Sequence, residues 1–280
     1  MKKSNSQYLE EVKQKTIEAG HLTPEFFTLY QDILKAQENF INKLNQLILK
    51  INLKSIEWPA LIPSNLKFSK ELNDLLNQEL LHLTEIIKIA QPGLKLETLT
   101  QTLTDSKFSY QDLAKLILEK NFNKINQEAS NLKIGGDEFF FIIVNLLKPI
   151  FISLKERYDW PKLDWDQPLC PFCHHYPDMN KIVESLDNKS FLHCSLCEHE
   201  WEFKRITCPI CENSDHESLG YYSSNEISLY RINYCKKCQG YIKTIKIPKS
   251  ESESNFNLTV ENIITTFLDA SALDLGYQRP

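Results

Sequence analysis

The sequence predicts an α+β protein, in which an N-terminal all-helical domain is followed by two small cysteine-rich β modules and a C-terminal helix. Three observations lead to this fold class. Apolar residues recur at helical spacing in four segments before residue 160. All eight cysteines stand in four Cys-x-x-Cys pairs between residues 170 and 238. Around these pairs, short runs alternate apolar and polar residues, as half-buried strands do.

The first half of the chain has the composition of a helical bundle. It is rich in Leu, Lys, Glu, Gln and Asn and has few β-branched runs. Thr23 before Pro24 is a typical helix start, and Asp137 after two glycines is a second candidate N-cap. We expect these helices to bury one another's apolar faces. The four segments are Pro24–Lys50, Ser69–Ala90, Ser109–Phe122 and Asp137–Tyr158.

The helical period stops at "YDWPKLDWDQPL", which marks a domain boundary. Beyond it, "HEWEFKRITC", "SLYRINYC" and "GYIKTIKI" have the alternation of strands, and "PKSESESN" is a solvated spacer. The last apolar segment, "NLTVENIITTFLDASALDL", predicts one amphipathic helix. A chain of 280 residues exceeds the usual size of one hydrophobic core. The predicted domains are a helical domain (1–165), two modules (166–206 and 207–250), and a linker with the C-terminal helix (251–280).

Charge and hydropathy disfavour nucleic acid and membrane as partners. The net charge is −5, and the stretch from Gln167 to Pro280 has 11 Lys and Arg against 15 Asp and Glu, which gives −4. Nucleic-acid binders have the opposite balance because they must neutralise phosphates, so no nucleic acid is expected. The start "MKKSNSQYLEEVKQ" lacks the apolar run of a signal peptide, and "FFFIIVNLLKPIFISL" is too short and too interrupted to span a bilayer. We expect a cytoplasmic protein without membrane insertion.

The four cysteine pairs have the spacing of metal sites. Two Cys-x-x-Cys turns at the two ends of a hairpin direct four thiolates toward one point, as in zinc ribbons and rubredoxin-like modules. The inner cysteines of the first two pairs enclose 20 residues and those of the last two pairs enclose 23. Sequential pairing is the preferred assignment, and cross-braced pairing as in RING domains is the alternative. The preferred sites are Cys170, Cys173, Cys194 and Cys197 for the first, and Cys208, Cys211, Cys235 and Cys238 for the second.

The pattern does not decide between zinc and iron, since tetrahedral sulfur suits both metals. A disulfide framework is disfavoured because no export signal is present and intracellular thiols stay reduced. Four protein ligands leave no position for an activated water, and no nucleophile motif or glycine-rich phosphate loop accompanies them, so we expect no enzyme. The nearby histidines are expected in solvated loops or in packing, and the nearby aromatic residues in small apolar cores. These are His174, His175, His193, His199 and His216, and Trp201, Phe203, Tyr222 and Tyr230.

The order of these motifs resembles one family. The segments "CPFC", "FLHCSLCEHEWEFKRITCPIC", "YRINYCKKCQGYIKTI" and "LDASALDLGYQRP" are similar to those of the formate dehydrogenase accessory protein family FdhE. The helical segment "AGHLTPEFFTLYQDILKAQ" also looks like the family's N-terminal part. One departure is His174, which stands where the family favours glycine after the first cysteine pair, a position that often requires positive φ.

The resemblance implies a cytoplasmic helper that is required for active respiratory formate dehydrogenase. Such a helper contacts the catalytic subunit before export and is absent from the finished complex. The resemblance also implies two rubredoxin-like modules associated with iron, with the eight cysteines as ligands and zinc as the alternative metal. Two further hypotheses use the same cysteines. One is a rubredoxin-like electron carrier or reductase acting on a client protein, and the other is a zinc-ribbon protein that binds nucleic acid.

Overall fold

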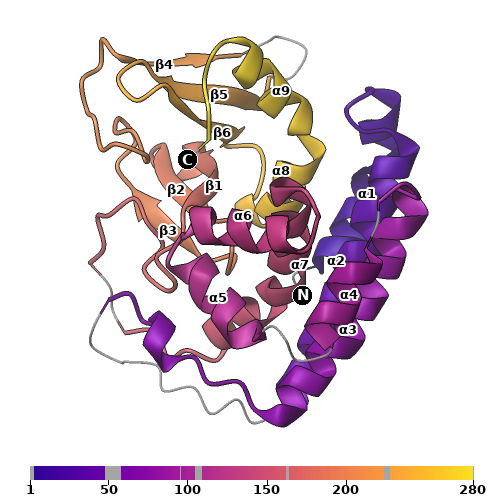
Figure 1. Cartoon of the computed structure of the whole chain (residues 1–280). Helices are drawn as coiled ribbons and strands as arrows, with labels where there is room; N and C mark the ends of the chain where they lie inside the picture. Colours follow the sequence, from indigo (N-terminus) through magenta and orange to yellow (C-terminus); the bar gives the residue numbers. More distant parts are fainter. Residues whose placement is uncertain are drawn as a thin grey trace. The chain divides into compact units, whose positions relative to one another are not determined.

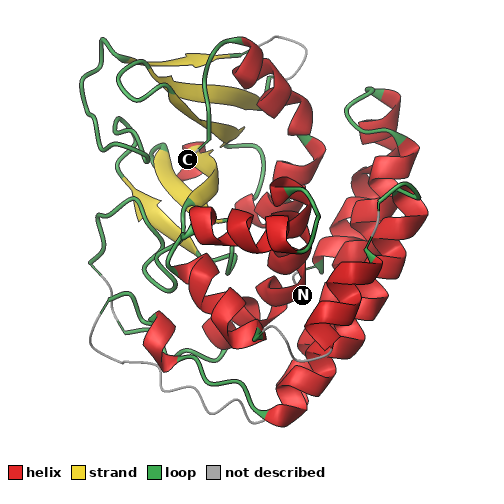
Figure 2. Cartoon of the chain, viewed as in Figure 1, coloured by secondary structure: helices red, strands yellow, loops and turns green. Residues whose placement is uncertain are grey.

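The structure, a computed structural model, describes residues 3–47, 58–94, 96–104, 109–161, 164–223 and 228–279. It divides into two compact units. One is Pro24–Pro161, and the other joins Met1–Thr23 to Lys162–Pro280. The first unit is helical, whereas the second contains a β-sheet with helices, as Figures 1 and 2 show. The predicted α+β class is confirmed.

The helical unit is built from amphipathic helices with polar caps. Ser69, Ser109 and Asn121 accept a hydrogen bond from the third backbone N–H of the helix that each precedes. Asp137 is not a cap: Gly135 is the N-cap of α7, and Asp137 lies in the first turn, where its charge favours the helix N-terminus. The helices are α2 (Pro24–Gln46), α3 (Lys70–Ala90), α4 (Glu97–Thr104), α5 (Tyr110–Leu118), α6 (Phe122–Asn131) and α7 (Gly136–Glu156), with a short 3₁₀ turn, η1 (Pro63–Asn65).

Helix α7 is the centre of this unit. Helices α2, α3 and α6 all pack against it, and Phe139 and Phe151 of α7 are fully buried, as is Phe40 of α2. The apolar run in α7 is therefore a core helix, as predicted. In the part of the chain that the structure describes, no helix has the length and apolar content needed to cross a bilayer. The end of the first predicted helical segment, residues 48–50, lies outside the described residues.

The other unit is organised around one six-stranded sheet. Its strands are β1 (Pro177–Val183), β2 (Lys189–Cys194), β3 (Glu200–Phe203), β4 (Leu219–Tyr222), β5 (Tyr230–Cys235) and β6 (Gly240–Ile247). Their spatial order is β3-β2-β1-β6-β5-β4. All neighbours are antiparallel except β1 and β6, which are parallel. Each cysteine module contributes three consecutive strands, and the β1–β6 pairing merges two expected ribbons into one sheet.

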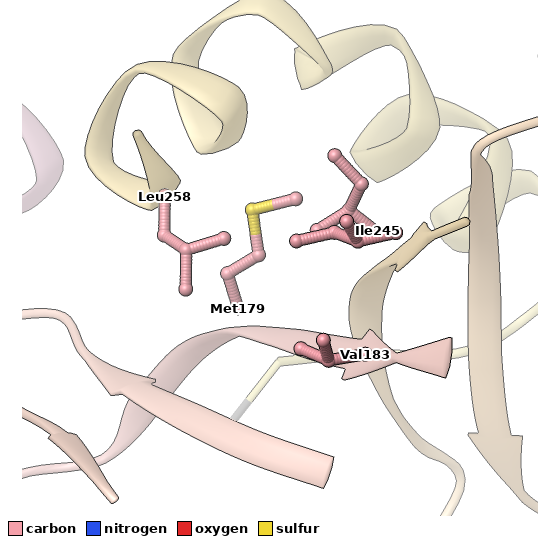
Figure 3. Packing of buried hydrophobic residues seen from close by; sticks show 5 residues of the cluster. Met179, Val183, Ile245 and Leu258 are labelled. Carbon is pink, nitrogen blue, oxygen red and sulfur yellow. The ribbon is translucent and has the colours of Figure 1, made fainter. Parts of the chain in front are cut away.

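Two C-terminal helices, not one, cover a face of this sheet. The predicted single helix is divided into α8 (Leu258–Ile264) and α9 (Thr266–Asp274), because Thr265 has a non-helical backbone and its hydroxyl donates to the Glu261 carbonyl. Figure 3 shows Leu258 of α8 in one cluster with Met179 and Val183 of β1 and Ile245 of β6. A second cluster joins Ile232, Tyr241, Leu268 and Ala272 beneath α9.

Helix α1 (Asn5–Glu18) belongs to the sheet-containing unit, although the predicted helical domain included it. Its Tyr8 hydroxyl donates to the buried carboxylate of Glu261 in α8, which also accepts from Tyr230 of β5. Asn5 bonds both Asn257 and Glu198. The compact units do not test which segments fold independently. The predicted domain boundaries at residues 165, 206 and 250 therefore remain predictions.

Candidate metal centres

Each cysteine pair lies at a turn that enters or leaves a strand. Cys170 and Cys173 precede β1, and Cys194 ends β2 so that the second pair leads into β3. The second module repeats this layout: its first pair precedes β4, Cys235 ends β5, and the last pair leads into β6. Each hairpin therefore places its two pairs at the same end, as the spacing predicts.

The four Cys-x-x-Cys turns share one backbone feature. The residue after the second cysteine of every pair has positive φ, which an L-residue other than glycine seldom adopts. In the first three turns its N–H donates to the carbonyl of the first cysteine, at 2.8 Å for His174 and 3.0 Å for Glu212. At position 174, where glycine is the expected residue, the chain forms the turn with histidine at φ 58°. The other three residues are Glu198, Glu212 and Gln239, at φ 56–57°.

The cysteine sulfurs form two four-sulfur groups, and within each group all Sγ atoms lie within 4.8 Å of one another. The Cys170–Cys197 and Cys173–Cys194 separations are 3.5 Å, and the Cys208–Cys238 separation is 3.7 Å. A disulfide needs about 2.05 Å. A tetrahedral ion with bonds of about 2.3 Å to sulfur needs about 3.8 Å between sulfurs, so both groups fit such an ion.

The structure brings together consecutive pairs, as sequential assignment expects, and not alternate pairs as in a cross-brace. The first group is Cys170, Cys173, Cys194 and Cys197, and the second is Cys208, Cys211, Cys235 and Cys238. Either group could hold one metal ion. Because protein sulfurs fill all four positions, the arrangement suits a structural or electron-transferring ion and leaves no vacant position for substrate.

The two groups differ in exposure to solvent. All four cysteines of the first group are buried, whereas Cys211 and Cys238 of the second are only partly buried. Burial raises the pKa of the Cys173 and Cys197 thiols, so a metal ion must displace their protons. At Cys235 burial acts in the same direction, but the N–H groups of Cys238 and Lys237 outweigh it and lower the pKa to about 7. In the first group the hydrogen bonds from the other three thiols likewise outweigh burial and lower the pKa of Cys194 well below its usual value, so each group contains one cysteine that forms a thiolate readily.

Histidines support the first group without joining it. His175 is buried and its Nδ1 lies 2.9 Å from the Ser195 hydroxyl, while the buried His193 has its Nδ1 2.7 Å from Asp178. The expectation of solvated loops holds for the exposed His174 and His216. The alternative expectation, packing, holds for His175 and His193, which are buried and each have a polar partner.

The aromatic residues near the cysteines differ in their burial. Trp201 and Phe203 are buried, as the prediction of small apolar cores requires. Tyr222, in contrast, is 40% exposed and stacks on Tyr234, which stacks in turn on Tyr277 near the C-terminus. This stack ties the edge of the second module to the last residues of the chain, and no local pattern in the sequence indicates it.

Sequence comparison matches one family model to the segment that contains the first four-cysteine group. The family model "FdhE, central domain" matches residues 169–205, which include all four cysteines of the first group. A "Protein FdhE homolog" of Aquifex aeolicus is 31% identical over 149 residues, or 51% of this chain and 50% of that protein. The homologue of Serratia proteamaculans is 26% identical over 169 residues, which cover 60% of this chain and 51% of that protein. The chain thus spans about half the length of these curated relatives.

Comparison of folds extends the likeness to the whole chain. The crystal structure of the FdhE protein from Pseudomonas aeruginosa matches with a TM-score of 0.61 and 20% sequence identity. The match covers 100% of this chain and 95% of that one. At this identity the match establishes the fold alone, while the family model locates sequence similarity on residues 169–205. The resemblance indicated by the cysteine motifs is therefore confirmed: the chain is similar to FdhE proteins in sequence over this segment and in fold over its whole length.

Proposed function

We propose that the protein is an accessory factor for the maturation of formate dehydrogenase, and that it binds the enzyme's catalytic subunit in the cytoplasm. The observation that carries this proposal is the pair of four-cysteine groups, the first of which lies inside the matched FdhE central domain. Closed four-sulfur sites favour a binding or electron-transfer role over an enzymatic one. The protein accordingly acts on a client protein and is itself no enzyme.

Each group holds one metal ion in this proposal, with the eight cysteines as ligands. Iron is the proposed metal and zinc is the alternative, since both accept tetrahedral sulfur. Bound iron would supply a one-electron couple, and zinc would supply only rigidity. The second candidate function, an electron carrier or reductase, is favoured by the partial exposure of Cys211 and Cys238, because an exposed sulfur brings a redox centre close to a partner.

Purification from the native host tests the main proposal. The tagged chain, isolated without oxygen, is expected to carry two metal ions and to retain a molybdenum- or tungsten-containing formate dehydrogenase subunit. The matched variants are Cys211→Ser, which removes a ligand, and Glu212→Asn, which changes its exposed neighbour. In a strain lacking the native protein, the first is expected to lose formate dehydrogenase support and the second to keep it.

Two results separate the alternatives. Absence of any formate dehydrogenase subunit from the purified material, together with normal formate dehydrogenase activity in the deletion strain, would refute the accessory role. Reversible bleaching of a visible iron–sulfur band by a client or reductant, at rates that match turnover, would instead favour the electron carrier.

A further inference from the structure

A cavity of about 410 Å³ lies beside the second metal centre, within the sheet-containing unit. It opens on the sheet face opposite α8 and α9. On β5, Ile232 packs beneath α9, so the alternate residues Arg231 and Asn233 point to the other face and line the cavity. The turn of the second centre, with Cys208 and Ile210, forms one wall. Cys208 and Cys235 of the second group line one side of the cavity, and its volume is within the range of ligand pockets.

The lining is cationic in a part of the chain that is acidic overall. Arg205, Arg231 and Lys246 line the cavity, and none of the described residues around it is an aspartate or glutamate. Lys246 is paired at 2.5 Å with Glu184, which lies outside the lining. The two arginines therefore give the cavity its charge. Burial, and then repulsion from Arg205, lowers the pKa of Arg231, so an anion beside them is stabilised.

Two buried polar atoms in the cavity lack a partner. Among the residues described, neither Nε of Arg231 nor Oδ1 of Asn233 has a hydrogen bond, although both atoms are buried. The Arg231 guanidinium lies 4.7 Å from the centre of the Tyr221 ring, which covers its face and leaves its edge for a ligand. Buried polar atoms are nearly always hydrogen-bonded, so these two indicate an absent ligand. The arginine requires an acceptor and the asparagine oxygen requires a donor.

Much of the remaining lining is apolar. Ile182 and Ile242 come from the strands below, and at the rim Ile206 is 56% and Tyr221 58% exposed. Large apolar side chains at such exposure commonly mark binding surfaces when they cluster around a pocket. The ligand must therefore combine an anion, a hydrogen-bond donor and an apolar group.

We propose that this cavity binds an extended peptide segment that carries a carboxylate next to an apolar side chain. The carboxylate accepts hydrogen bonds from Arg231, with Arg205 nearby, and a backbone N–H donates to Oδ1 of Asn233. The two protein groups are two residues apart on one strand, about 6.6 Å, which is the spacing between alternate residues of an extended peptide. A fully ionised phosphate has no hydrogen-bond donor for Asn233, and a monohydrogen phosphate has one O–H but no apolar group for the isoleucines of the lining. A client segment is the natural occupant, so the inference rests on the proposed function.

Fluorescence anisotropy with the metal-loaded full chain tests the cavity. The probe is the labelled peptide Ac-Leu-Glu-Leu-Gly-amide, and its control contains Gln in place of Glu. We expect saturable binding of the Glu peptide and at least about 10-fold weaker binding of the Gln peptide, the size of one charge-assisted hydrogen bond. Arg231→Met, which keeps an apolar stem on Tyr221, is expected to weaken binding by a similar factor.

Two further variants keep the test independent of folding. Ile206→Glu places an acid on an exposed rim position and is expected to repel the Glu peptide, whereas Lys204→Met removes an exposed charge outside the lining and is expected to change affinity less than 2-fold. Equal binding of both peptides, unchanged affinity in Arg231→Met and Ile206→Glu, or no saturable binding would overturn the proposal. Displacement of the peptide by millimolar inorganic phosphate would assign the cavity to a phosphate instead.

The client experiment separates this inference from the proposed function. If Arg231→Met still retains the formate dehydrogenase subunit, the cavity is not the client site, but the accessory role stands. If the wild-type chain binds the Glu peptide yet retains no formate dehydrogenase subunit, the peptide site stands and the accessory role fails.

Discussion

Pro149 lies in the interior of α7, where a proline removes one helical hydrogen bond. The bond lost is the one to the carbonyl of Asn145, four residues earlier. The buried side chain of Gln37 in α2 replaces it, since its Nε2 donates to the Asn145 carbonyl at 3.0 Å and lies 3.1 Å from Asn145 Oδ1. One buried amide therefore allows the proline to sit in the core helix.

Removing that amide is expected to destabilise the helical unit only while the proline is present. Gln37→Leu leaves a buried carbonyl without a donor, which costs about 1–3 kcal/mol of unfolding free energy. In a Pro149→Ala background the backbone N–H at position 149 can donate to the Asn145 carbonyl. Gln37→Leu is then expected to lower the free energy of unfolding clearly less. Urea unfolding of the two single variants and the double variant measures this coupling. Equal losses in both backgrounds would contradict it, and Gln46→Leu, exposed at the end of α2, is the control.

Lys243 is fully buried in β6, and its ammonium donates to Asp269 of α9 at 2.7 Å and to the Asn262 carbonyl. Burial, and then the charge of Arg279, lowers the pKa of Lys243 to about 8, against an ordinary 10.5. Between these two values the unfolded chain binds a proton that the folded chain does not. The contribution of Lys243 to stability therefore rises with pH across this window, by at most about 1.4 kcal/mol per pH unit.

Lys243→Met is expected to remove this rise. Unfolding free energies of wild type and variant, measured at intervals from pH 7.5 to 10, are compared with those of Lys204→Met, whose side chain is exposed. A slope that is identical in Lys243→Met and wild type would show that another group is responsible.

At the scale of elements, the two four-cysteine groups differ in their exposure to solvent. The first centre is enclosed, whereas Cys211 and Cys238 of the second are partly exposed. With a chromogenic chelator we expect two phases of metal release of equal amplitude, the second centre losing its ion first, because a chelator can reach its sulfurs directly. Cys208→Ser is expected to abolish the fast phase and Cys170→Ser the slow one. A single phase in the wild type, or a fast phase that survives in Cys208→Ser, would contradict this order.

Helix α1 is attached to the sheet-containing unit through a buried acid. Burial raises the pKa of Glu261, and the hydroxyls of Tyr8 and Tyr230 are its hydrogen-bond donors. Tyr8→Phe is expected to cost about 1–3 kcal/mol, since the acid then loses one of two donors. Native-state hydrogen exchange is expected to locate the loss in α1 and α8, and in Glu261→Gln the cost of Tyr8→Phe is expected to shrink. Unchanged protection of α1 in Tyr8→Phe would show that apolar packing alone holds it.

At the scale of the whole molecule, what could be predicted from the sequence was mostly local. A Cys-x-x-Cys turn specifies its own backbone, so the four turns follow from the sequence, and the spacing favours their sequential grouping over the cross-braced alternative. The parallel pairing of β1 with β6 joins segments about 60 residues apart, and no short pattern indicates it. Helix α1 was missed because its apolar residues are few, and its partner Glu261 lies about 250 residues away. The cavity lined by Arg231 was missed for the same reason, since its residues converge from four strands and two turns.

The division into two compact units predicts how the molecule responds when one metal is lost. Metal binding is part of the folding energy of a four-cysteine module, about 10–16 kcal/mol for zinc in finger peptides, but the apolar core of Pro24–Pro161 contains no cysteine. Cys208→Ser leaves three sulfurs and a poor hydroxyl ligand at the second centre. The variant is therefore expected to keep one metal ion per chain and nearly all of its far-ultraviolet helicity. Protease cleavage is expected to concentrate between β4 and β6, whereas Glu212→Asn is expected to behave as wild type. Loss of most helicity in Cys208→Ser would show that the helical unit depends on the second centre for its own folding.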